Sequence, residues 1–118
     1  MAPHFTIPGV DVQKGVALVV GLEEVYREAL EVLLEDIEER LPPLQNTENH
    51  SNAKLISLHA HALKSASASI GAEQMHLDAQ ELEAEADSND FALIGEKLPA
   101  FLLSVEDLYA NIKAALRQ

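Results

Sequence analysis

The sequence predicts an all-α protein, an antiparallel up-and-down four-helix bundle with a short extra helix at its N-terminal end. Ala, Leu and Glu are abundant, whereas aromatic residues make up only 4% of the 118 residues. Four long segments repeat apolar residues at steps of three and four, which is typical of amphipathic helices, and no segment alternates as a strand would. Four such helices with short connections pack best as one bundle, so we expect a single domain over residues 1–118.

The N-terminal part of the chain is expected to contribute an arm and the short helix. Residues 1–8 show no periodic pattern and are interpreted as a flexible arm. A short helix is expected over residues 11–20, because Asp11 is a good N-cap residue and Gly21 is a good stop. This helix should cover one end of the bundle.

The first bundle helix is expected over residues 22–41. Its apolar residues form one stripe, and acidic residues cover the other face. Pro42-Pro43 should end it, because proline disfavours helical backbone at the preceding residue. A polar loop follows, with Ser51 or Asn52 as the N-cap of the next helix.

Three further helices complete the predicted bundle. The second is expected over residues 52–70 and should stop at Gly71, and the third is expected over residues 73–87. The last is expected over residues 90–116, after a short loop rich in capping residues. Pro99 lies inside this last helix, so we expect a kink or a short break there.

The formal net charge of −12 at neutral pH excludes several classes of partner. A polyanion repels phosphate backbones and anionic membrane surfaces, so neither a nucleic acid nor a membrane is an expected partner. The absence of Cys excludes disulfides and thiolate metal sites. No apolar run is long enough to span a membrane, and the first residues lack the pattern of a secretory signal. We therefore expect a cytoplasmic protein.

The helix over residues 52–70 differs from the others because it combines small residues with two His and two Lys. At about 100° per residue, one side of this helix is expected to face the core. Its members are Leu55, Ile56, Leu58, Ala62, Leu63, Ala66 and Ile70, with His59 among them. His61 and Lys64 should point away from the core, with the small residues Ser57, Ala60 and Ala68 beside them and Ser65 at the edge.

An exposed His61 among small side chains could act as a nucleophile, because imidazole is mostly neutral at cellular pH. Lys64 lies on the neighbouring turn of the same face, where its charge would stabilise an anionic group transferred to His61. The competing interpretation is an ordinary surface histidine. A metal site is not expected, because His59 and His61 at i and i+2 face nearly opposite ways on a helix.

No enzyme constellation accompanies these residues. The serines near His61 do not form a Gly-x-Ser-x-Gly elbow, and no glycine-rich phosphate loop is present. Carboxylates occur throughout the sequence, so no pair stands out as an acid–base couple.

The motif around His61 resembles the signature of histidine-containing phosphotransfer domains. His61-Ala62-Leu63-Lys64-Ser65, followed by Ile70-Gly71-Ala72, is similar to the family pattern of His-x-Leu-Lys-Gly, small residues and Gly-Ala. The lead-in Ile7-Pro8-Gly9-Val10-Asp11 with Gly15 and the downstream Leu82-Glu83 are also similar, so the resemblance covers nearly the whole chain. The family usually has a glycine after the lysine, and this glycine allows the partner a close approach. In this sequence the position is occupied by Ser65, which is also small.

The resemblance implies a cytoplasmic four-helix bundle that acts in a multistep phosphorelay without independent turnover. His61 would take a phosphoryl group from a receiver-domain aspartate and pass it to another receiver, and Lys64 would stabilise the phosphate. Ser57, Ala60, Ser65 and Ala68 would let the receiver approach closely. Glu83 is a candidate for orienting His61, or else a plain surface residue.

The partners implied are response-regulator receiver domains, which would supply Mg²⁺, so this chain itself needs no cofactor. A monomer is the default for the family. The lead-in would also suit a domain cut from the end of a hybrid sensor histidine kinase, and the sequence leaves that open. The alternative function is a helical docking module that is not phosphorylated. The distribution of the acidic residues favours the phosphorelay function. None of them lies between Asn49 and Ala72, around His61, where a carboxylate would repel an incoming phosphoryl group.

Overall fold

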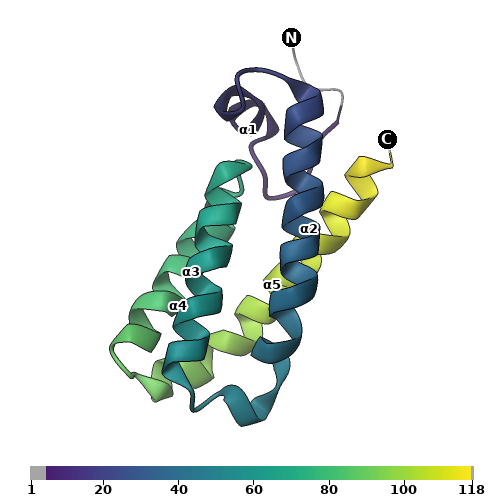
Figure 1. Ribbon diagram of the computed structural model, residues 1–118. Coiled ribbons are helices and arrows are strands. Elements are labelled where there is room, and N and C mark those ends of the chain that lie inside the picture. Colours follow the sequence, from purple (N-terminus) through teal and green to yellow (C-terminus); the bar gives the residue numbers. More distant parts are fainter. Residues whose placement is uncertain (1–4, 118) are drawn as a thin grey trace.

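The computed structural model describes residues 5–117 of the chain, which form an all-α bundle. The elements are α1 (Val12–Leu18), α2 (Glu23–Gln45), the 3₁₀ turn η1 (Thr47–Asn49), α3 (Ala53–Ser69), α4 (Glu73–Asp87) and α5 (Phe91–Leu116). Helices α2 to α5 run antiparallel in succession, and α1 lies at one end of the bundle (Figure 1). The molecule is elongated, with extents of 45 × 22 × 18 Å. The predicted fold class and the short end helix are confirmed.

The short helix α1 begins as the sequence predicts and ends earlier. The Asp11 side chain accepts a hydrogen bond from the backbone N–H of Lys14, so the predicted N-cap is confirmed. The helix ends at Leu18, because the following backbone turns into the left-handed region at Val20 (φ 55°) and Gly21 (φ 76°). Gly21 therefore lies in the turn after the helix and does not itself terminate it.

The segment before α1 is packed against the core, contrary to the expectation of a flexible arm. Residues 1–4 lie outside the described part of the chain. Phe5 and Ile7 are buried, and the Phe5 ring stacks on Tyr26 with 6.2 Å between centroids. The Val10 N–H donates to the Ile7 carbonyl at 3.1 Å, which closes a turn. Two apolar side chains at alternate positions were the signal in the sequence for this packing.

The predicted end of the first bundle helix at Pro42-Pro43 is wrong, because α2 continues through both prolines. Leu44, in the last turn, is completely buried and packs in the hydrophobic core. The carbonyl of Pro42 accepts a hydrogen bond from the Asn46 N–H, and the carbonyl of Pro43 accepts one from the Asn49 side-chain amide. Burial and these two hydrogen bonds offset the cost of proline near a helix end.

The later helices follow the predicted boundaries closely. Asn52 and Asp90 cap α3 and α5, each accepting a backbone hydrogen bond through its side chain. The break considered at Pro99 is absent, because α5 is one uninterrupted helix. Leu98 and Phe101 on either side of the proline are buried, so packing holds this segment in helical form.

The end of α3 is fastened to α1 by a set of close backbone contacts, which we call the N-terminal clasp (Asp11, Gly15, Tyr26, Ile70 and Gly71). Gly71 has φ 85°, and its carbonyl accepts a hydrogen bond from the Asp11 N–H at 2.9 Å. A Cβ on Gly71 would lie 2.3 Å from the Asp11 carbonyl oxygen, and one on Gly15 would lie 2.4 Å from that of Ile70. Both glycines are therefore required for this contact.

Tyr26 completes the clasp from α2. Its hydroxyl donates a hydrogen bond of 2.7 Å to the carbonyl of Ile70, one residue before the turn at Gly71. Burial, with a smaller contribution from the charge of Asp11, raises the pKa of Tyr26 to about 12. The hydroxyl therefore remains a donor throughout the physiological pH range.

Tyr26→Phe should lower the free energy of unfolding by about 1–2 kcal/mol, because the buried Ile70 carbonyl loses its side-chain donor. Urea unfolding followed by circular dichroism measures this change. Tyr109→Phe is the matched control, since the Tyr109 hydroxyl binds the exposed Glu38 carboxylate, and we expect a change within about 0.5 kcal/mol. Equal effects of the two substitutions would contradict the account of the clasp.

Candidate functional histidine site

The exposed face of α3 carries the predicted nucleophile. The side chain of His61 is 62% exposed, and no large side chain of α3 covers it. Ser65 is exposed beside it, and Ser57 and Ala68 are half-buried one and two turns away. Lys64 is also half-buried, because its amine folds back toward α4.

Two residues of α3 face other directions than the sequence predicted. Leu58, expected in the core, is 64% exposed, and Ala60, expected beside His61 on the surface, is completely buried. The helix geometry explains both, because Leu58 lies three residues before His61 and so shares its face, whereas Ala60 is turned by about 100°. Leu58 therefore replaces Ala60 in the surface around His61.

Glu83 of α4 is the residue that organises this site. Its Oε2 lies 2.6 Å from His61 Nδ1, and its Oε1 lies 2.6 Å from Lys64 Nζ. The Glu83 side chain is only 16% exposed, whereas the His61 side chain that it binds is 62% exposed. The antiparallel packing of α4 against α3 brings Glu83 to His61 and Lys64, although it lies 22 and 19 residues further along the chain.

The contacts of Glu83 determine its charge and the tautomer of His61. The hydrogen bond from Lys64, reinforced by the one from His61, holds the pKa of Glu83 below its usual value of 4.5, although burial opposes the shift. An ionised carboxylate only accepts hydrogen bonds, so His61 Nδ1 must carry the hydrogen. In a neutral ring, Nε2 then keeps its lone pair, on the edge opposite Glu83.

The other described histidines are engaged elsewhere. His59 Nδ1 accepts a hydrogen bond of 3.0 Å from Arg40, and burial, assisted by the Arg40 charge, lowers the pKa of His59. His76 Nδ1 lies 3.0 Å from the Lys64 carbonyl, to which it donates. Within residues 5–117, no three His, Asp or Glu side chains are arranged to hold a metal ion.

Helix α4 also brings a second carboxylate to the edge of the site. The Ser57 hydroxyl donates to Asp87 at 2.6 Å. The acid-free stretch between Asn49 and Ala72 suggested that no acid lies near His61. The structure shows that this expectation is wrong, because α4 brings two carboxylates to the site. The acids border α3 on its α4 side, where Glu83 and Asp87 are both bound to residues of α3.

The α2 side of the site has a different character. A hollow of about 320 Å³ lies between α2 and α3, and it is lined mainly by small and apolar residues: Ala29, Val32, Leu33, Asp36, Ala66 and Ser69. Two large apolar side chains are exposed on this side: Val32 of α2, at the hollow, is 63% exposed, and Leu58 of α3 is 64% exposed. Neither residue was predicted to border the site, although the spacing of Leu58 from His61 on one helix was sufficient to identify it.

The fold and this site define a class of protein. The model of the Hpt domain family matches residues 24–115, and the chain therefore belongs to that family. Hpt domains carry phosphoryl groups on histidine in phosphorelays.

The crystal structure of histidine-containing phosphotransfer protein B (HptB) from Pseudomonas aeruginosa PAO1 is similar to this chain, with a TM-score of 0.74 and 25% sequence identity. The similarity covers 96% of this chain and 95% of HptB. No curated protein matches the sequence significantly. None of the helices in the described part of the chain is long and apolar enough to cross a membrane.

Proposed function

We propose that His61 accepts a phosphoryl group from the aspartyl phosphate of a receiver domain and passes it to the aspartate of another. The observation that carries this proposal is the hydrogen bond from His61 Nδ1 to Glu83, which leaves Nε2 as the nucleophile on an exposed surface. Phosphoryl transfer depends mainly on positioning and on charge stabilisation, and Glu83 and Lys64 would contribute to both on the side of this chain. The receiver would supply Mg²⁺.

The proposed step replaces the bond between phosphorus and an aspartyl oxygen by a bond between phosphorus and a histidine nitrogen. The Nε2 lone pair of His61 attacks the phosphorus, an N–P bond forms, and the bond from phosphorus to the aspartyl oxygen breaks to regenerate the carboxylate. The ring retains its Nδ1 proton and becomes a phosphorylated imidazolium. Its positive charge develops 2.6 Å from the ionised Glu83, which stabilises it. The reverse sequence transfers the group to the second receiver.

Lys64 is proposed to stabilise the phosphoryl group. Its amine has three hydrogens, so it can keep its bond to Glu83 and donate another to a phosphoryl oxygen. It lies one turn from His61 on the same face of α3, within reach of a group on Nε2.

The receiver is proposed to dock over α3 and the hollow between α2 and α3. Ser65 and Ala68 allow a close approach, and Leu58 and Val32 offer exposed apolar contacts. Helix α4 is less suited to this contact, since Glu83 and Asp87 would repel an acidic phosphorylated partner.

Incubation with a ³²P-phosphorylated receiver and Mg²⁺ tests the proposed function. We expect label on this chain that is labile in acid and stable in base, as a phosphoramidate is, and its return to a second, unphosphorylated receiver. A panel of receivers makes the test independent of one partner. Phosphoramidate itself, a small phosphoryl donor, serves as a second source of the phosphoryl group. If neither the receivers nor this donor label the folded chain, the result contradicts the proposal and favours a docking module that is not phosphorylated.

Lys64→Ala and Glu83→Gln should each slow transfer about tenfold, because each removes one charge that stabilises the phosphorylated state. Rapid-quench measurements at several receiver concentrations separate the maximal rate from the apparent affinity. We expect the maximal rate to fall with little change in affinity. Lys64→Arg, which keeps the positive charge, should recover most of the rate, and an unchanged rate in Lys64→Ala would remove Lys64 from the mechanism.

A further inference from the structure

A groove between α4 and α5 lies on the side of α4 away from His61. It consists of two adjoining hollows of about 270 and 280 Å³ that share Asp78 and Ser104 in their linings. Glu81 lines this groove, whereas Glu83 two residues later binds His61 on the other side of α4. The groove is thus separate from the phosphotransfer site.

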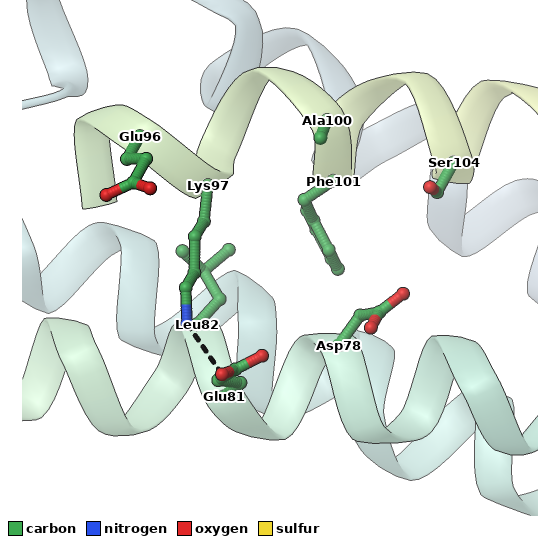
Figure 2. A pocket seen from close by; sticks show the side chains of 8 residues that line it. All are labelled: Asp78, Glu81, Leu82, Glu96, Lys97, Ala100, Phe101 and Ser104. Carbon is green, nitrogen blue, oxygen red and sulfur yellow. Dashed lines mark hydrogen bonds and ion pairs between the residues drawn. The ribbon is translucent and has the colours of Figure 1, made fainter. Parts of the chain in front are cut away.

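The groove has an apolar floor. Leu82 of α4 and Phe101 of α5 face each other across it, and Phe101 points from α5 toward α4 (Figure 2). Met75 and Leu108 continue the floor into the second hollow. Its α5 wall runs from Glu96 to Asn111, about 22 Å at 1.5 Å per residue, which matches about four turns of an added helix.

The rim of the groove is acidic. Asp78 and Glu81 on α4 face Glu96 and Asp107 on α5. Among the described residues that line it, Lys97 is the one cation, and it reaches from α5 across the groove to the carboxylate of Glu81 (Figure 2).

The ion pairs of Lys97 show how this groove holds a cation. Its Nζ lies 2.6 Å from Glu81 Oε1 and 2.7 Å from Glu85 Oε1, so two carboxylates share one amine. Glu85 is 7% exposed, and its second oxygen, Oε2, is buried without a hydrogen-bond partner.

Two exposed leucines lie on the helices that form the groove, although neither of them lines it. Leu77 on α4 lies four residues before Glu81 and is 55% exposed, and Leu103 on α5 lies four residues before Asp107 and is 62% exposed. Residues four apart share a helix face, so each leucine stands next to an acidic rim residue. Exposed apolar side chains among carboxylates complement a helix that carries leucines and basic residues together.

We propose that the groove between α4 and α5 is a docking surface for a basic amphipathic helix of a partner protein. Apolar side chains of that helix would cover Leu77 and Leu103. Its Arg or Lys side chains would pair with Asp78, Glu96 and Asp107 along the rim. The length of the groove and its charge favour this occupant over an acidic or a purely apolar segment.

A synthetic helical peptide of Leu, Ala and Arg, about four turns long, is the probe for this proposal. It is titrated into the ¹⁵N-labelled full chain, and backbone chemical shifts are followed by NMR. We expect shifts confined to residues 74–82 and 96–111 and to the segment around Gly9, which also lines the second hollow, and none with a peptide in which Glu replaces Arg. Absence of binding at about 1 mM peptide, or equal binding of the Glu peptide, would overturn the proposal.

Matched variants separate a specific groove from attraction by net charge. Glu96→Gln/Asp107→Asn should weaken binding of the Arg peptide about fivefold. Glu31→Gln/Glu35→Gln makes the same charge change on the exposed face of α2 and should have less than about half that effect. Equal effects would show that net charge alone attracts the peptide. The peptide titration does not require phosphorylation of His61, so this test does not depend on the proposed function.

Discussion

His61→Gln is expected to fold like the natural protein and to take up no phosphoryl group from any receiver. The side chain of His61 is largely exposed and is hydrogen-bonded to Glu83, so the substitution removes little packing. The Gln amide has no nucleophilic nitrogen, because its lone pair is delocalised into the carbonyl. Phosphoryl uptake should therefore fall to background, and the thermal unfolding midpoint should change little.

Labelling from a ³²P-phosphorylated receiver measures this loss, and circular dichroism verifies that the variant is folded. His59→Gln and His76→Gln are the matched controls, because both histidines are bound to other groups of the protein. Both folded controls should keep their label. Label that persists on His61→Gln, or that disappears from folded His76→Gln alone, would place the phosphoryl group on a different residue.

Gly71→Ala should lower the free energy of unfolding by about 3 kcal/mol, the largest expected loss of stability in this set. Gly71 has φ 85°, where an L side chain costs about 1–2 kcal/mol. Its new Cβ would also lie 2.3 Å from the carbonyl oxygen of Asp11, so the N-terminal clasp must shift. In Gly15→Ala the new Cβ would lie 2.4 Å from the Ile70 carbonyl oxygen, and the free energy of unfolding should fall by about 2 kcal/mol.

Gly95→Ala is the matched control for these two glycines. It lies inside α5 with nothing within 4 Å of an added Cβ, so alanine should raise stability by about 0.5–1 kcal/mol. Urea unfolding with an unchanged m-value gives the three free energies. If Gly71→Ala and Gly95→Ala shifted the midpoint in the same direction, the clasp would not be a stabilising contact.

The sequence predicted the helices well wherever a cap or a stop was decisive. Asp11, Asn52 and Asp90 cap helices as their residue type suggests, and Gly71 lies in the left-handed turn after α3. The prediction failed at Pro42, because the burial of a residue beyond it depends on the tertiary structure. Local propensity alone indicates a stop there, whereas core packing extends α2.

The exposure of His61 could be predicted, but its environment could not be predicted completely. Spacing on one helix places Lys64 and Leu58 beside it, and Leu58 was assigned wrongly to the core although that spacing was available. Glu83 is a different case, because its contact with His61 depends on how α4 is rotated against α3. Its position among 20 acids carries no such information, and only the resemblance to phosphotransfer domains indicated it as a candidate.

The contact between the N-terminal segment and the end of α3 was likewise hidden in the sequence. Gly15 and Gly71 are separated by all of α2 and all of α3, yet each allows the backbone of the other segment to approach. The small residues themselves were visible in the sequence. Their pairing required the tertiary structure, because a glycine indicates a close approach without naming the segment that approaches.

The position of the phosphoryl group on the imidazole ring tests the central proposal most directly. The chain, with ¹⁵N in its histidine rings, is phosphorylated by a receiver and examined by ³¹P and ¹⁵N NMR. Because Glu83 holds the Nδ1 hydrogen of His61, we expect a single phosphoramidate, with phosphorus coupled to Nε2 of His61 and the Nδ1 hydrogen retained. Phosphorus coupled to Nδ1, or to a ring other than that of His61, would contradict the proposal.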